Sequence, residues 1–221
     1  DMGKSGYRKK HHKQDVNADT KAIKEIQSYL NKMTDKTSEK IICEIKHRLV
    51  NRDYLYKMIM ESFVEKCIIY PQYNQLYLSA MVDIYVKRPD FKEVFVQCID
   101  ESYEALLHLE IQEDSEYLTF CAENKRLDKL IGHSMLLTEC EKANVVKDRI
   151  HPSISSLLDI LKEGSSEEES YKCVQCLYEI MKSLYGSGSL PEMYQEQIQG
   201  LVDSEEKRKI KYKMMDILER R

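Results

Sequence analysis

Apolar residues recur every three or four positions along almost the whole chain from residue 20 onward. This spacing matches the 3.6-residue turn of an α-helix, so each run presents one apolar face that can be buried. Short polar corners separate the runs, and the chain is therefore predicted to be all-α. The runs cover approximately residues 23–33, 41–49, 55–67, 76–86, 91–107, 118–137, 146–162, 174–184, 193–202 and 210–218.

The spacing of the runs also predicts how the helices are arranged. A helix pair recurs at intervals of roughly 40 residues, which is the period of HEAT-like helical solenoids. We therefore expect about five antiparallel helix pairs, or about ten helices. A compact ten-helix bundle is the alternative, because no repeated sequence is visible from one pair to the next. The chain has only 7 Gly and 4 Pro, too few for the many turns of an all-β fold.

Local signals predict where some helices begin and end. A residue that precedes proline avoids the helical region, so helices should end before Pro71 and Pro89. Asp90 is expected to cap the helix that follows. Pro152 lies inside the run 146–162, where it should either kink the helix or move its start.

Residues 1–19 differ from the rest of the chain, because they contain few apolar residues and many basic ones. We expect a flexible basic arm, followed by a single helical domain over residues 20–221. Weak contact with RNA through its phosphates is one function of such an arm, and a terminus without function is the alternative. The residues predicted to contact RNA are Arg8, Lys9, Lys10 and Lys13.

No pattern in the sequence predicts catalysis, a metal ion or a cofactor. The histidines are scattered, and neither an HExxH nor a GxSxG motif is present. Cys173 and Cys176 form an isolated CxxC pair, which is typical either of half a zinc site or of two small thiols facing a core. The second reading is favoured because no further ligand pair is nearby. We expect neither an enzyme nor a small-molecule substrate.

Charge and cysteine content limit the cellular setting. The net charge is −4, which argues against nucleic-acid binding by bulk charge. The 7 cysteines are an odd number, and the first residues lack a hydrophobic centre. No apolar run approaches the roughly 18 residues that a membrane span needs. We expect reduced thiols, a cytoplasmic location and no membrane partner.

Three stretches together resemble one known family. Residues 26–34, IQSYLNKMT, are similar to the opening helix and corner of the middle domain of eukaryotic translation initiation factor 4G. Residues 127–146, LDKLIGHSMLLTECEKANVV, resemble a later helix of that domain, with Gly132 and Glu139 at the matching positions. Residues 208–221, RKIKYKMMDILERR, resemble its closing helix. The stretches follow the family's order.

The resemblance implies a function as well as a fold. The family domain is a crescent of five HEAT-like helix pairs that serves as a scaffold in translation initiation. It binds a DEAD-box RNA helicase, initiation factor 4A, and stimulates the ATPase and unwinding cycle by holding the helicase's two lobes. The partners implied for this chain are an initiation-factor-4A-like helicase, RNA and other initiation factors.

The resemblance further implies which residues contact the helicase. The corner after the first helix is a helicase-binding hot spot of the family, and its two apolar positions correspond to Leu30 and Met33. Ser38 stands where the family has an aromatic residue, and Asp35 stands where it has proline. The implied helicase-binding residues are Leu30, Asn31, Lys32, Met33, Thr34, Glu139, Lys209, Lys211, Tyr212 and Asp216.

Two alternatives stay open. Related domains occur in other scaffolds of mRNA metabolism, including partners of poly(A)-binding protein and factors of nuclear cap binding, splicing and nonsense-mediated decay. The other alternative is a helical module that binds RNA by itself, which strong salt-sensitive RNA binding without a helicase would indicate.

Overall fold

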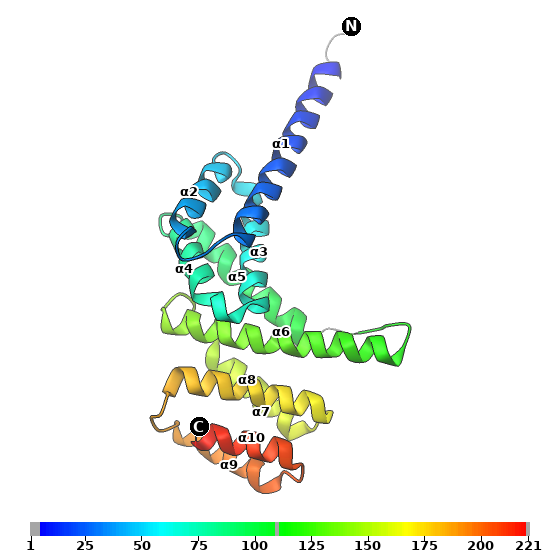
Figure 1. The fold of residues 1–221 in the computed structure, drawn as a ribbon, viewed down its shortest axis with the longest axis vertical. Coiled ribbons are helices and arrows are strands. Elements are labelled where there is room, and N and C mark those ends of the chain that lie inside the picture. Colours follow the sequence, from blue (N-terminus) through cyan, green and yellow to red (C-terminus); the bar gives the residue numbers. More distant parts are fainter. Residues whose placement is uncertain (1–4, 109–110, 220–221) are drawn as a thin grey trace. The chain divides into compact units, whose positions relative to one another are not determined.

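The computed structural model describes residues 5–108 and 111–219, with side chains from residue 16 onward. Within these residues the chain forms ten α-helices and two short 3-10 helices, and no β-strand. The all-α, solenoid-like fold class predicted from the spacing is confirmed. The α-helices are α1 (Ser5–Asn31), α2 (Ser38–Leu49), α3 (Tyr56–Ile69), α4 (Asn74–Tyr85), α5 (Pro89–Leu107), α6 (Glu116–Lys142), α7 (Ile150–Glu163), α8 (Glu167–Tyr185), α9 (Glu192–Ser204) and α10 (Arg208–Glu219) (Figure 1). The 3-10 helices are η1 (Asp53–Leu55) and η2 (Pro71–Tyr73).

The chain divides into two compact units, and each is described by itself. Unit 1 comprises Asp1–Glu65 and Leu76–Cys98, and unit 2 comprises Lys66–Gln75 and Ile99–Arg221. Helices α1 and α2 lie in unit 1, and α6 to α10 lie in unit 2. The single domain expected over residues 20–221 stays a prediction.

In unit 1, α1 packs on α2 through the apolar stripes that the sequence predicts. An ion pair between Arg48 of α2 and Glu25 of α1, 2.6 Å long, lies beside this contact. Three aromatic pairs join α3, α4 and α5. Each pair of rings stabilises the packing beyond the contribution of buried apolar area. The buried residues of the first two stripes are Ala22, Ile26, Leu30, Met33, Ile41, Ile42, Ile45 and Leu49. The aromatic pairs are Tyr56–Phe91, Phe63–Tyr77 and Tyr85–Phe95.

In unit 2, α8 is the central helix. It packs against α6, α7 and α10, and α10 also packs on α9 (Figure 1). Because several helices contact it, its apolar face is wider than a single stripe. Ser166 caps its start by accepting a hydrogen bond from the Glu169 N–H (3.2 Å), and Gly186 ends it with a φ of 53°. The buried residues of α8 are Ser170, Cys173, Val174, Cys176, Leu177, Tyr178, Ile180 and Met181.

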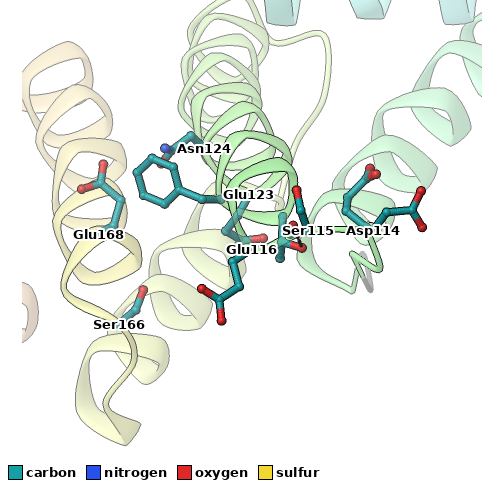
Figure 2. A pocket seen from close by; sticks show the side chains of 10 residues that line it. Asp114, Ser115, Glu116, Glu123, Asn124, Ser166 and Glu168 are labelled. Carbon is teal, nitrogen blue, oxygen red and sulfur yellow. Dashed lines mark hydrogen bonds between the residues drawn. The ribbon is translucent and has the colours of Figure 1, made fainter.

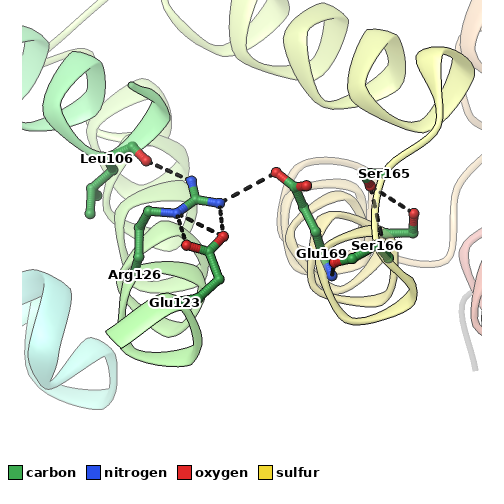
Figure 3. Close-up of polar contacts among 7 residues, drawn as sticks. Leu106, Glu123, Arg126, Ser165, Ser166 and Glu169 are labelled. Atoms are coloured by element: carbon green, nitrogen blue, oxygen red, sulfur yellow. Dashed lines mark hydrogen bonds and ion pairs between the residues drawn. The ribbon is translucent and has the colours of Figure 1, made fainter. Parts of the chain in front are cut away.

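Arg126 is a buried cation of unit 2. Its guanidinium donates to the Glu123 carboxylate, to the Leu106 carbonyl (2.7 Å) and to the Glu169 carboxylate (3.3 Å) (Figure 3). One side chain therefore links the end of α5, the body of α6 and the start of α8. Glu123 is the main cause of the raised pKa of Arg126, and Glu169 adds to it. A buried charge requires partners of this kind, because leaving one unpaired is strongly destabilising.

Gly132 allows the backbone of α6 to lie against the last turn of α3. A Cβ atom at this position would lie 2.0 Å from the carbonyl oxygen of Ile68. No side chain fits in that distance, so the close approach requires glycine. The glycine that the family resemblance picks out therefore has a packing role in this chain.

Two predicted helix starts were wrong by a few residues. Helix α5 begins at Pro89, so Asp90 lies in the first turn, and its carboxylate accepts a hydrogen bond from Arg88 (2.8 Å). Helix α7 begins at Ile150 rather than near residue 146, which places Pro152 in the first turn. An N–H in the first turn has no partner within the helix, so proline costs little there.

The first helix starts earlier than expected. Helix α1 begins at Ser5, so residues 5–19, predicted to be a flexible arm, continue the helix. This segment contains no proline, and once the buried part of α1 is formed each further turn adds hydrogen bonds at little cost. The side chains of the predicted RNA contacts, Arg8, Lys9, Lys10 and Lys13, lie outside the described part of the structure.

The close approach at Gly132 predicts a difference between two glycine-to-alanine variants. Gly132→Ala should lower the free energy of unfolding by about 2 kcal/mol or more, since the added methyl meets backbone atoms. Gly200→Ala is the matched control, because a Cβ there meets no atom within 4 Å. It should raise the stability by up to about 1 kcal/mol, as alanine does inside helices. Urea unfolding followed by circular dichroism measures both, and equal effects would contradict the packing described here.

The buried His133 predicts a loss of stability in mild acid. Its Nε2 lies 3.0 Å from the Ile99 carbonyl, and burial lowers its pKa from 6.5 to about 4. Between these values the unfolded chain takes up a proton and the folded chain does not. The free energy of unfolding should therefore fall from pH 6.5 to pH 4, by about 3 kcal/mol from this residue. His133→Gln should flatten the pH dependence and His108→Gln, at an exposed position, should not; equal pH profiles for all three proteins would refute this assignment.

Candidate protein-binding site

The corner between α1 and α2 is an ordered polar surface of unit 1. The Thr37 side chain holds it: its Oγ1 accepts from the Thr34 N–H (2.9 Å) and donates to the Lys32 carbonyl (3.1 Å). The Thr34 carbonyl accepts the N–H groups of Thr37 (3.0 Å) and Ser38 (2.8 Å). Asn31, Lys32 and Thr34 are all exposed on this framework. Three of the predicted helicase-binding residues are thus presented to solvent by a fixed backbone.

The two apolar residues of the same corner are not on the surface. Leu30 is 1% exposed and Met33 is 7% exposed, so the expectation that they meet a partner directly does not agree with the structure. They continue the stripe of Ala22 and Ile26, which the helical period turns toward the core. The Leu30 carbonyl also accepts a hydrogen bond from the Tyr77 hydroxyl (3.3 Å). Both side chains support the corner from beneath.

Helix α10 carries the second predicted group, in unit 2. Its buried face consists of Ile210, Met214 and Ile217. Tyr212 is 60% exposed, and Asp216, one turn later on the same face, is half-buried. Lys211 is half-buried and, one residue from Tyr212, lies on a different side of the helix. Tyr212 and Asp216 therefore form one small polar and aromatic surface.

Lys209, also predicted to bind the helicase, contacts its own chain. Its ammonium lies 3.9 Å from the ring centroid of Tyr171 on α8. Lys213, one turn later, lies 3.7 Å from the ring centroid of Tyr178. Such cation–π contacts contribute to the packing of one helix on another. The position of Lys209 therefore indicates a role in holding α10 against α8.

Glu139 lies in the last turns of α6, and only 18% of its side chain is exposed. Its carboxylate accepts hydrogen bonds from Gln75 (3.2 Å) and Lys142 (3.3 Å). It also lines a shallow groove of about 360 Å³, together with Pro71 and Lys182 among others. The polar atoms of this residue are therefore engaged within unit 2.

The predicted residues are divided between the two units. Leu30 to Thr34 lie in unit 1, whereas Glu139 and the α10 residues lie in unit 2. Of the ten residues, Asn31, Lys32, Thr34, Lys209 and Tyr212 are exposed. A groove at the start of α6 was not predicted from the sequence. The aromatic residues Tyr117 and Phe120, next to acidic residues, could have indicated it.

The cysteine pair of α8 is part of the core. Cys173 and Cys176 are both fully buried, in agreement with the reading of two core-facing thiols. Burial raises the pKa of Cys173 to about 12 and also raises that of Cys176. Among the residues that the structure describes, no group of three His, Cys, Asp or Glu side chains is placed to hold a metal ion. None of the described helices is both long and apolar enough to cross a membrane.

No protein-family model matches the chain, and no curated protein matches it.

Proposed function

We propose that the chain is a scaffold of translation initiation that binds a DEAD-box RNA helicase of the initiation-factor-4A type. The observation that carries the proposal is the corner between α1 and α2, where buried Leu30 and Met33 support exposed Asn31, Lys32 and Thr34. The corner is also one of the three stretches that resemble the initiation factor 4G family. Helical repeat proteins commonly bind their partners through extended surfaces built from successive helices.

A scaffold can act on a two-lobed helicase by limiting how far the lobes separate. The lobes must close on ATP and RNA and open again, and a partner that favours the productive arrangement shifts that equilibrium. In our proposal the α1–α2 corner contacts one lobe, and the surface of Tyr212 and Asp216, with Lys211 on the adjacent side of α10, contacts the other. Interface charges such as Lys32 then set the orientation and the rate of association.

The burial of Leu30 and Met33 determines which variants test the proposal. Replacing both by alanine would remove core side chains and destabilise unit 1, because a buried Leu or Met costs about 2–5 kcal/mol when truncated to alanine. Weaker helicase binding by that double variant would not identify an interface. Exposed residues of the same corner are the informative choice.

Charge reversal at the corner should weaken helicase binding. Lys32→Glu is expected to raise the Kd for an initiation-factor-4A-like helicase about tenfold, since a cation at the interface becomes an anion. Lys40→Glu is the matched control, because Lys40 is exposed on α2 of the same unit and outside the corner. Isothermal titration calorimetry gives both values. If wild-type protein does not bind the helicase, or if both variants bind as wild type does, the corner is not the contact.

Truncation on α10 tests the second contact. Tyr212→Ala should also weaken binding about tenfold, as exposed aromatic residues at interfaces do. Met193→Ala is the control, because Met193 on α9 is 58% exposed, close to the value for Tyr212. The RNA-dependent ATPase rate of the helicase provides a second readout, and Tyr212→Ala should reduce its stimulation. Full stimulation by Tyr212→Ala would remove α10 from the proposed interface.

A further inference from the structure

The first turns of α6 are not covered by the rest of unit 2. Every residue from Glu116 to Lys125 is exposed or half-exposed, and full burial begins at Arg126. Three large apolar side chains lie on this stretch: Tyr117 is 73% exposed, Leu118 46% and Phe120 59%. A single exposed apolar residue is ordinary, but a group of three on one uncovered helix segment is typical of a binding surface.

An open groove of about 600 Å³ lies beside this segment. Phe120 lines it together with five acidic residues, Glu113, Asp114, Glu116, Glu123 and Glu168. Glu168 comes from the start of α8, and Figure 2 shows it across the groove from the residues of α6. The groove therefore combines an exposed aromatic ring with carboxylates on two sides.

The charge of the groove is only partly balanced by its surroundings. Glu123 is paired with the buried Arg126. None of the described residues that line the groove is a lysine or an arginine. The N-termini of α6 and α8 stabilise carboxylates in the first helical turn, which accounts for Glu116 and Glu168 without a ligand. It does not account for the exposed Phe120 among them, or for the exposed Tyr117 and Leu118 on the same helix segment.

We propose that this groove binds a positively charged protein segment, rich in arginine or lysine, that places a cationic side chain over Phe120. A cation gains energy over an aromatic ring, and the flanking carboxylates attract its neighbours. Nucleic acid does not fit this chemistry, because its phosphates would face unpaired carboxylates. The inference is independent of the proposed helicase function, since it concerns another surface and another class of partner.

Charge neutralisation within the groove tests the proposal. The probe is a fluorescein-labelled nona-arginine peptide, and its binding to the full chain is followed by fluorescence anisotropy. The triple variant Glu113→Gln, Asp114→Asn, Glu168→Gln should raise the Kd at least about tenfold, because it removes charges on two sides of the groove. The matched control Glu192→Gln, Glu196→Gln, Glu206→Gln changes the net charge equally at exposed positions outside the groove. It should change the Kd less than about twofold.

Substitution of the aromatic ring tests the other half of the proposal. Phe120→Ala and Phe120→Leu should both raise the Kd about threefold, because both lose the ring face that attracts a cation. Tyr73→Ala, at a position 54% exposed outside the groove, should leave it unchanged. Phe120 and Tyr73 are both exposed, and circular dichroism checks for every variant that helicity is retained.

Several results would overturn the proposal. Equal weakening by the groove and control triple variants would show that net charge alone attracts the peptide. Unchanged binding by Phe120→Ala would remove the aromatic contact. A labelled single-stranded RNA that binds the wild type more tightly than the peptide, and loses that binding in the groove variant, would assign the surface to nucleic acid.

Discussion

The buried guanidinium of Arg126 divides α6 into two parts with different roles. From Arg126 onward the helix is packed, with Leu127, Leu130 and His133 in the core of unit 2. A buried cation must be paired, so the Glu123 and Glu169 carboxylates and the Leu106 carbonyl are held around it. That requirement holds the end of α5, the body of α6 and the start of α8 beside one another. The uncovered turns of α6 and the acidic groove follow from the same arrangement.

The helical period was enough to predict the fold class and most of the helices, because one apolar stripe per helix is a local property of the sequence. It was not enough for features that depend on distant residues. The partners of Arg126 include residues 20 and 43 positions away, so its burial could not be read from its own helix. Gly132 was noticed through the family resemblance, but its reason is the Ile68 carbonyl of another helix. The starts of α5 and α7 shifted because proline is readily accepted in a first turn.

The candidate site was predicted less completely than the fold. The resemblance implied that Leu30 and Met33 form a docking surface, whereas the periodicity was compatible with a core position for Leu30. The structure places both residues in the core. Exposure at a corner depends on how the chain turns, which Thr37 determines through its hydrogen bonds. Lys209 was predicted as a contact for a partner. Its ammonium instead lies over the ring of Tyr171, which is 38 positions earlier in the sequence. The groove joins α6 to the start of α8, which only the folded chain brings together.

The central proposal is that exposed polar and aromatic residues at a helix corner and on α10, supported by buried apolar ones, bind a helicase. Hydrogen exchange of the wild-type chain, with and without an initiation-factor-4A-like helicase, tests this most directly. The predicted result is slower exchange of the backbone amides of residues 31–37 and 211–216 in the complex, with the buried part of α8 unchanged. A complex that forms without protecting either segment, or no complex at all, would contradict the proposal.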